Sequence, residues 1–389
     1  MSEFETWQLL LIPCFFGLGW LAARIDMRQV VQESRVLPRS YFQGLNFLLN
    51  EQPDKAIDAF LEVARGDQQT VELHFALGGL FRRRGETERA IRMHQSLLDR
   101  EDVTDETRLQ ALFELGQDYL KAGLLDRSEE IFMRLVETSL KGEAQRALLE
   151  IFQLEKEWQK AIEIAKQLPD LASRRELAQF HCELAANALM RSNFIEAHRY
   201  LDEALGINRK CVRATLLLGD TLILEGQPEQ ALLVWQRIEQ QDPAYLALVA
   251  QRLLDAYRSQ SKQTEGMTLL RAYLERYPSL DILEVLYQLV QENEGLESAY
   301  HLVRAELQRN PTLLGVDKML TARMPLVPAE TRTDVELLRT VVQGYTRRLA
   351  RYRCEACGFK ARQHYWRCPA CGGWECYPPR RSEEFDSTL

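Results

Sequence analysis

The pattern of hydrophobic and polar positions divides the chain into three stretches. Residues 6–23 form an apolar run without a charged side chain. From about residue 40 to residue 333, small and bulky apolar residues recur in phase among Leu, Ala, Glu, Gln and Arg, which are strong helix formers. The last stretch, from about residue 353, is short and rich in cysteine and aromatic residues. This pattern predicts a mostly helical chain with a distinct segment at each end.

The apolar run Thr6–Ala23 is long enough to cross a membrane as one helix. At about 1.5 Å per residue it spans roughly 27 Å, and Trp7 and Trp20 lie near its ends, where aromatic rings favour the lipid interface. A cleaved signal peptide and a buried core helix are the alternatives. The run is preceded by acidic residues rather than basic ones, and it has no polar face. We therefore expect a transmembrane anchor over residues 1–23.

Positive charge follows the apolar run, in a linker that we assign to residues 24–39. The basic residues of the linker include Arg24, Arg28, Arg35 and Arg39. Because cytoplasmic flanks carry the excess of Lys and Arg, we expect the chain after Arg24 to lie in the cytoplasm. That compartment is reducing and keeps cysteine thiolates available for metal.

The middle of the chain repeats with a period near 34 residues. Eight pairs of residues stand twelve positions apart, and the second members, usually small, follow one another at intervals of 33 to 38 residues. The pairs are Gly44/Ala56, Gly78/Ala90, Gly116/Ser128, Leu149/Ala161, Ala185/Ala197, Gly219/Ala231, Leu254/Gly266 and Tyr287/Ala299. Four positions after the second member most copies have a bulky residue, such as Trp235, but the second copy has His94.

These positions favour stacked helical hairpins. Two antiparallel helices approach closely only where a small side chain faces the partner, and no hairpin buries its apolar faces alone. The pattern resembles the tetratricopeptide repeat family over residues 40–311, with about eight copies. We therefore predict an all-α superhelical array over residues 40–333, whose concave groove binds peptides or protein segments.

Repeat position gives candidates for the surface of the groove. The residues expected to face it are Arg82, Arg83, Gln117, Lys121, Asp220 and Arg258. Each of them also fits an ordinary solvated surface position. Cys182 and Cys211 fall within helical segments, and we expect them to be buried thiols that act as small hydrophobes.

Four cysteines near the C-terminus have the spacing of a metal site. Cys354, Cys357, Cys368 and Cys371 form C-x2-C-x10-C-x2-C, in which each pair can direct both sulfurs at one ion. Redox-active CxxC pairs and disulfides are the alternatives, but no thioredoxin-like pattern surrounds the cysteines and the expected compartment is reducing. We predict one ion, structural zinc or rubredoxin-type iron, in a module at residues 353–380 that resembles rubredoxin knuckles. Residues 381–389 form a tail.

The surroundings of the four cysteines suggest how the module is held. Cys376 lies outside the two-pair spacing and is not expected to be a ligand. Tyr365, Trp366 and Trp374 are expected to cover the site. A connecting helix, at about Asp334–Arg351 within a segment assigned to residues 334–352, is expected to dock the module onto the array.

The C-terminal region is basic, although the whole chain has a net charge of −8. The candidate basic patch consists of Arg347, Arg348, Arg351, Arg353, Arg362 and Arg367. Such a patch could bind RNA, anionic lipid head groups or an acidic protein surface. Because we expect a membrane anchor, we rank protein and lipid above nucleic acid.

Motifs of catalysis are absent from the sequence. The six histidines are scattered without an HExxH pair, and neither a Walker loop nor a GxSxG elbow is present. We therefore predict a protein without catalytic residues.

The order of the three parts, an N-terminal anchor, a repeat array and a terminal CxxCGF…CPACGGW motif, resembles the lipopolysaccharide assembly protein B family of Gram-negative bacteria. The resemblance implies a single-pass inner-membrane protein with its bulk in the cytoplasm and metal ligands at Cys354, Cys357, Cys368 and Cys371. It also implies partnership with a membrane AAA+ zinc protease in the degradation of the deacetylase that commits precursor to lipid A, and contact with other lipopolysaccharide synthesis enzymes.

Two other functions remain open at the level of sequence. The basic knuckle could belong to a metal-dependent RNA-binding regulator. A rubredoxin-type iron would instead suit a redox protein.

Overall fold

The structure is a computed structural model that describes residues 43, 44, 46, 47, 50, 52, 55–57, 59, 71–167, 174–349 and 352–381, without the side chains of 347–349. The predicted anchor, linker and most of the tail lie outside these residues. Among the helices that are described, none is both long enough and apolar enough for a membrane crossing. The chain forms two units, Met1–Ala147 (unit 1) and Leu148–Leu389 (unit 2).

Unit 1 contains successive antiparallel helices. Helix α4 packs on α5, α5 on α6 and α6 on α7, and α8 crosses from unit 1 into unit 2. The bounds are α4 Val71–Arg84, α5 Thr87–Leu98, α6 Asp105–Lys121, α7 Leu125–Leu135 and α8 Lys141–Glu155.

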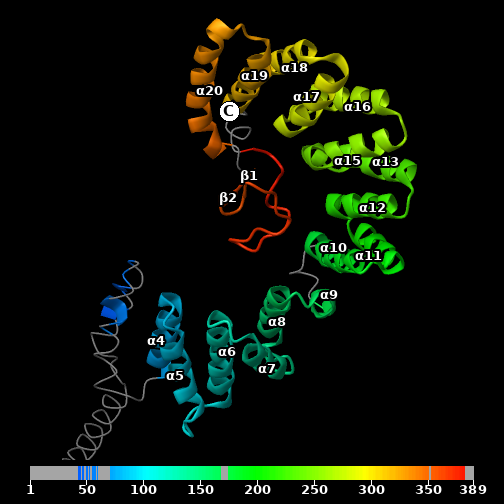
Figure 1. The fold of residues 1–389 in the computed structure, drawn as a ribbon. Helices are drawn as coiled ribbons and strands as arrows, with labels where there is room; N and C mark the ends of the chain where they lie inside the picture. The colour runs from blue at the N-terminus through cyan, green and yellow to red at the C-terminus, as the bar shows by residue number, and fades with distance from the viewer. Residues whose placement is uncertain are drawn as a thin grey trace, which may run out of the picture. The chain divides into compact units, whose positions relative to one another are not determined.

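Unit 2 continues the pattern through α19 and ends in a small module that follows α20 (Figure 1). Its helices are α9 Trp158–Gln167, α10 Arg174–Met190, α11 Phe194–Ile207, α12 Val212–Leu224, α13 Pro228–Gln236, α14 Ile238–Gln241, η1 Pro243–Tyr245, α15 Leu246–Ser259, α16 Gln263–Arg276, α17 Leu280–Glu294, α18 Leu296–Arg309, α19 Leu313–Arg323, η2 Met324–Leu326 and α20 Ala329–Leu349. The module adds β1 Tyr352–Arg353 and β2 Lys360–Ala361, which pair antiparallel. The described residues thus contain seventeen α-helices, α4 to α20, and the predicted helical-hairpin array is confirmed.

The predicted repeat positions coincide with the close contacts between paired helices. The members of each pair from Gly78/Ala90 to Tyr287/Ala299 lie on consecutive helices of one hairpin. A Cβ atom at Gly116 would lie 2.8 Å from the Phe132 ring, and one at Gly219 would collide with the Trp235 indole. The bulky residue four positions after the second small residue therefore packs on the first small residue. His94 does the same against Gly78, which explains why the second copy tolerates it.

First helices of neighbouring hairpins are joined by ion pairs. In unit 1, Arg82 of α4 reaches Asp118 and Glu114 of α6 at 2.9 and 2.6 Å. In unit 2, Arg252 of α15 pairs with Asp220 of α12 at 2.8 Å. These pairs follow the repeat period, so adjacent hairpins are linked through charge as well as through their apolar faces.

Candidate metal centre and its docking surface

The four predicted cysteines lie together in the C-terminal module. Their sulfur atoms are all within 4.8 Å of one another. Each CxxC segment makes the same tight turn, in which the N–H of Gly358 donates to the Cys354 carbonyl and that of Gly372 to the Cys368 carbonyl, both at 2.9 Å. Both glycines have positive φ, 74° and 70°, which a residue with a Cβ adopts only with strain. Two matched turns therefore point four thiols at one volume.

The geometry of this cluster suits one metal ion. The Cys354–Cys371 and Cys357–Cys368 sulfur distances are 3.9 and 3.7 Å. A tetrahedral ion with metal–sulfur bonds of about 2.3 Å needs sulfur–sulfur separations of roughly 3.8 Å. Zinc and rubredoxin-type iron share this ligand set, so the arrangement fits either.

The environment favours thiolate at one ligand. Burial acts to raise the pKa of Cys354, but hydrogen bonds from the backbone at Cys357 and Ala356 and from the Cys376 thiol lower it to about 6. Cys354 and Cys368 are buried, whereas Cys357 and Cys371 are exposed. One edge of the cluster therefore faces the surface of the module.

A fifth cysteine lies beside the cluster. The Cys376 sulfur is 3.4 Å from that of Cys354, and burial raises the pKa of its thiol. The four mutually close sulfurs do not include it. Spacing in the sequence gives no sign of this proximity, because Cys376 follows the second knuckle after a further turn.

The aromatic residues near the knuckles are divided between two roles. Tyr365 packs with the core of the module, which is formed by Tyr352, Tyr377 and two of the cysteines. Trp366 and Trp374 instead face the array. We expected all three aromatic residues to cover the metal site; Tyr365 packs in the module, but the two tryptophans pack on the array instead.

Both tryptophans stack on aromatic residues of the array. Trp366 lies parallel to Tyr245, with ring centroids 5.4 Å apart and an interplanar angle of 5°. Trp374 meets Trp158 and Phe180 edge-on, with both centroids at 6.0 Å. The main hydrophobic cluster of unit 2, which spans residues 212–322, also packs against Trp366. The module thus extends the core of the array.

Arg213 of α12 lies between the two tryptophans. Its guanidinium carbon is 5.8 and 5.9 Å from the ring centroids of Trp366 and Trp374. The side chain is nearly buried and pairs with Glu183 of α10 at 2.8 Å. Because a guanidinium is attracted to aromatic faces, this residue joins two helices of the array to the module.

The docking surface is the set of array residues that contact the module. Its N-terminal half, on α8 and α10, also makes polar contacts. Arg367 donates to the Gln153 carbonyl at 3.0 Å, and Trp374 Nε1 donates to the Gln153 side chain at 3.2 Å. Gln179 Nε2 donates to Glu375 at 2.6 Å. Burial raises the pKa of Glu375, and the bond from Gln179 opposes that rise.

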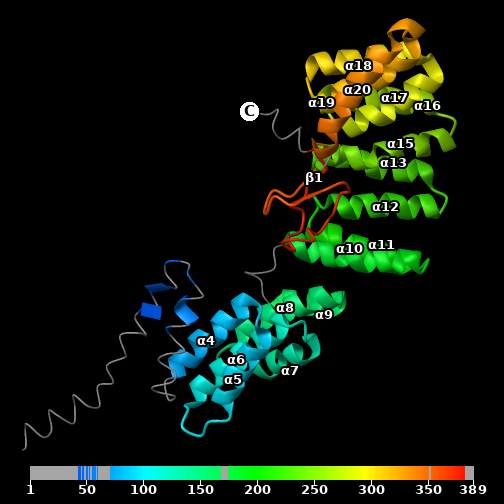
Figure 2. The same ribbon diagram turned by 60° about the vertical axis from the view of Figure 1, so that its left-hand side comes forward.

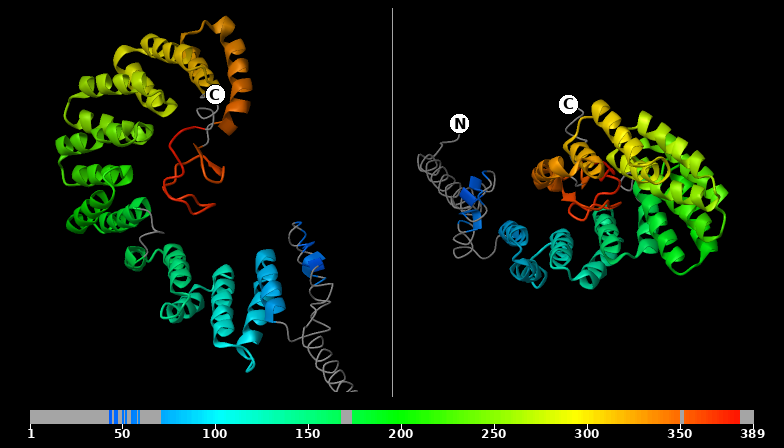
Figure 3. Two further views of the ribbon diagram at one scale, coloured as in Figure 1. Left: turned by 180° about the vertical axis from the view of Figure 1, so that it is seen from behind. Right: turned by 45° about the horizontal axis from the view of Figure 1, so that its top comes forward.

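The C-terminal half of the docking surface centres on Asp281 of α17. Arg381 pairs with it at 2.5 Å, and the Tyr352 hydroxyl donates to it at 3.2 Å. Figures 1, 2 and 3 show the module against the side of the stack formed by first helices α10, α12, α15 and α17. The module itself makes these contacts, whereas α20 packs on α19. The docking role predicted for the connecting helix stays a prediction, because the side chains at the end of that helix, 347–349, lie outside those that the structure describes.

Cys182 and Cys211 lie beneath this surface. Both are fully buried, as predicted, and their sulfurs are 3.8 Å apart. Gln179, which binds Glu375 of the module, also contacts the Cys211 sulfur at 3.5 Å. The pair is part of the packing below the docked module.

The predicted groove residues are divided between the two units. Arg82, Arg83, Gln117 and Lys121 belong to unit 1, whereas Asp220 and Arg258 belong to unit 2. Three of the six pair with a neighbouring first helix: Arg82 with Asp118 and Glu114, Asp220 with Arg252, and Arg258 with Glu292. Arg83 and Lys121 are exposed and Gln117 is half-buried. Their role in binding stays a prediction.

The predicted basic patch is described only in part. Arg353 and Arg362 are exposed on the module. Arg367 is partly buried and donates to the Gln153 carbonyl, and burial lowers its pKa. The side chains of Arg347 and Arg348, and the whole of Arg351, lie outside the described residues.

Fold and site together define a tetratricopeptide-type repeat protein that carries a rubredoxin-type metal-binding module. Comparison with known families agrees: residues 43–100 and 188–252 match tetratricopeptide repeat models, and residues 352–376 match the rubredoxin metal binding domain. Among solved structures, that of Naa15/Naa10 bound to HypK-THB aligns at 15% identity and a TM-score of 0.39, covering 79% of this chain and 53% of that one, which is too distant to carry an argument.

Two curated relatives match nearly the whole chain. Lipopolysaccharide assembly protein B of Escherichia coli (strain K12) is 35% identical over 378 residues, covering 96% of this chain and 97% of the relative. The protein of the same name from Haemophilus influenzae is 31% identical over 390 residues, covering 96% and 98%. The chain belongs to the lipopolysaccharide assembly protein B family.

Proposed function

We propose that this protein is a non-catalytic adaptor that regulates lipopolysaccharide biosynthesis at the bacterial inner membrane. The observation that carries the proposal is the match to lipopolysaccharide assembly proteins over 96% of the chain, from the segment before the array to the metal module. A stack of helical hairpins presents a long surface for protein segments, which suits an adaptor.

The proposed partners are a membrane AAA+ zinc protease and the deacetylase that commits precursor to lipid A. The adaptor holds the deacetylase beside the protease and so promotes its degradation, and it also gathers other lipopolysaccharide synthesis enzymes. In this proposal residues 1–23 cross the membrane and the rest of the chain is cytoplasmic. Tethering raises the local concentration of client beside protease, which can strengthen apparent affinity by about a hundredfold without new contacts.

The proposed role of the metal is to keep the module folded so that it stays docked. The four thiolates of Cys354, Cys357, Cys368 and Cys371 hold one ion of zinc or iron. When bound, that ion supplies a crosslink between the two knuckles. The docked module then fixes the positions of the first helices from α8 to α17, against which it packs.

Crosslinking in native membranes tests the proposal directly. A photo-crosslinking amino acid at exposed Arg83 or Lys121 should capture the deacetylase or the protease, identified by mass spectrometry, whereas one at Met133 on the second helix α7 serves as the control. Capture of neither partner from the first-helix positions, or equal capture from the control, would contradict the proposed adaptor role.

A further inference from the structure

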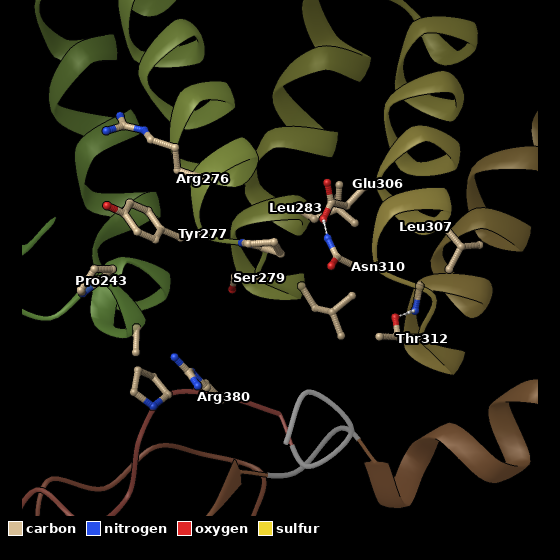
Figure 4. A pocket seen from close by; sticks show the side chains of 15 residues that line it. Pro243, Arg276, Tyr277, Ser279, Leu283, Glu306, Leu307, Asn310, Thr312 and Arg380 are labelled. Carbon is tan, nitrogen blue, oxygen red and sulfur yellow. Dashed lines mark hydrogen bonds between the residues drawn. The ribbon is translucent and has the colours of Figure 1, made fainter. Parts of the chain in front are cut away.

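A cavity of about 320 Å³ lies in unit 2 where the array meets the end of the module (Figure 4). The turn between α16 and α17 provides Tyr277 and Ser279, and the turn between α18 and α19 provides Asn310 and Thr312. The module closes the remaining side through Pro379 and Arg380. The cavity therefore exists in this form only when the module is docked.

The interior of the cavity is mainly apolar. Leu283 and Leu307 line it together with Tyr277. Its one buried carboxylate, Glu306, accepts a hydrogen bond from Asn310 at 2.6 Å and has the Arg309 guanidinium 3.7 Å away. Asn310 and Arg309 therefore each face one oxygen of the Glu306 carboxylate and partly offset its negative charge.

The rim of the cavity is positive. Arg380 is exposed and lies on the module side of the opening (Figure 4). Helices α17 and α19, of 15 and 11 residues, both begin there, after the N-cap residues Ser279 and Thr312, so the positive ends of two helix dipoles meet at one opening. An apolar interior with a positive rim suits a ligand that joins an aromatic or aliphatic group to carboxylates.

In the sequence, such a segment follows directly after the module residues that line the cavity. The sequence after Arg381 reads Ser-Glu-Glu-Phe-Asp-Ser-Thr-Leu, which places Phe385 among Glu383, Glu384 and Asp386. Four residues separate Arg380 on the rim from Phe385, so the distance between these two residues is up to roughly 17 Å when the chain is extended. This length is sufficient for Phe385 to reach the cavity interior from Arg380 at its rim.

We propose that residues 382–389 occupy this cavity in the same molecule, with Phe385 in the apolar interior and the acidic residues at the rim. The segment then acts as a strap that fastens the module to α17 and α19, in addition to the contacts of Trp366 and Trp374. This inference is independent of the proposed partners.

A peptide-binding experiment on the solubilised full chain tests the strap. A chain that ends after Arg381 is compared with the intact chain for binding of a fluorescent peptide of residues 382–389, measured by anisotropy. The truncated chain is expected to bind the peptide, and the intact chain at least tenfold more weakly, because its own tail competes at high effective concentration. Truncation is also expected to speed amide exchange at the starts of α17 and α19, and the peptide should restore protection.

Matched variants locate the binding in the cavity. In the truncated chain, Leu307→Trp fills the interior of the cavity and Arg380→Glu reverses the charge at its rim. Each substitution should lower the affinity for the peptide at least tenfold. Because Arg380 is exposed, Arg380→Glu is not expected to disturb folding, and it tests the binding site even if Leu307→Trp perturbs the fold. A Phe385→Ser peptide should lose binding to a similar extent.

The same experiment distinguishes other occupants. Equal peptide binding by the intact and truncated chains would assign the cavity to a separate acidic partner and overturn the strap. Crosslinks from a photo-reactive residue at position 385 to a second copy of the chain would do the same. Absence of binding together with unchanged amide exchange after truncation would also refute it.

Discussion

Neighbouring hairpins are held together differently in the two units. In unit 1, buried Asp118 of α6 accepts from Arg82 of α4 and lies 2.5 Å from His94 Nδ1 of α5, so one carboxylate joins three helices. In unit 2, helices α8, α9, α10, α12 and α17 and the 3-10 helix η1 each contact the metal module. The corresponding ring in unit 2, Trp235, needs only the Leu216 carbonyl, to which it donates at 3.1 Å.

The same position of the repeat is therefore stabilised in two different ways in the two units. A polar ring at the close contact requires a charged partner from the next hairpin, whereas an indole leaves the neighbouring first helices available to other contacts. Unit 1 should therefore depend on its internal charges and be indifferent to metal. Unit 2 should depend on the module and hence on metal.

Metal removal should produce the largest effect, and only in unit 2. Structural four-thiolate sites contribute binding energies of about 10 kcal/mol, so a chelator, or the double variant Cys354→Ser with Cys357→Ser, should unfold the module. Amide exchange should then rise around Gln153, Gln179 and Asp281. Exchange in α4–α6 is the internal control, and an equal rise there would show that the two units are not supported differently.

Loss of the shared carboxylate should produce the next largest effect, confined to unit 1. Asp118→Ala removes the partner of the His94 ring and one of the two carboxylate partners of Arg82, in a site where the Asp118 side chain is fully buried. We expect a loss of about 3–5 kcal/mol in the free energy of unfolding, measured by denaturant titration. The same substitution at Asp220, whose side chain is 30% exposed, serves as the matched control, and a comparable loss there would contradict the assigned role of burial.

Acid should weaken docking through His364. Burial among aromatic rings lowers its pKa from 6.5 to about 4, so the undocked state binds the proton first as pH falls. The docked state keeps its full stability above pH 6.5 and loses up to about 3 kcal/mol by pH 4, since one pKa unit is worth about 1.4 kcal/mol. His364→Phe should flatten this part of the pH dependence of the unfolding midpoint. Identical pH profiles of the two proteins would exclude His364 as the source of the acid-dependent loss of stability.

Removal of a surface ion pair should produce the smallest effect. Arg252 and Asp220 have side chains that are 44% and 30% exposed, so solvent screens their attraction. Arg252→Ala is expected to cost less than about 1 kcal/mol in the free energy of unfolding. A loss as large as that of Asp118→Ala would mean that ion pairs between first helices matter equally in both units.

Local spacing made the hairpins and the ligand set predictable. The contact between Gly219 and Trp235 joins residues sixteen positions apart, and the four cysteines lie within eighteen residues, so a repeat period and a CxxC spacing carry the necessary information. The N-terminal anchor and most of the first hairpin remain predictions, because they lie outside the described residues.

The docking of the module could not be predicted in the same way. Its contacts join Gln153 to Trp374 and Gln179 to Glu375, and nothing in the local pattern of either segment indicates the other. The two tryptophans were assigned to the metal because they adjoin the knuckles in the sequence. Their rings instead face aromatic residues more than a hundred positions away.

The half-life of the deacetylase in cells that carry Trp374→Ala tests the central claim most directly. This variant keeps all four cysteines but removes the ring that packs on Trp158 and Phe180. The account predicts that the metal stays bound, the module undocks and the deacetylase persists longer than with the unaltered chain. An undocked module with an unchanged deacetylase half-life would contradict it.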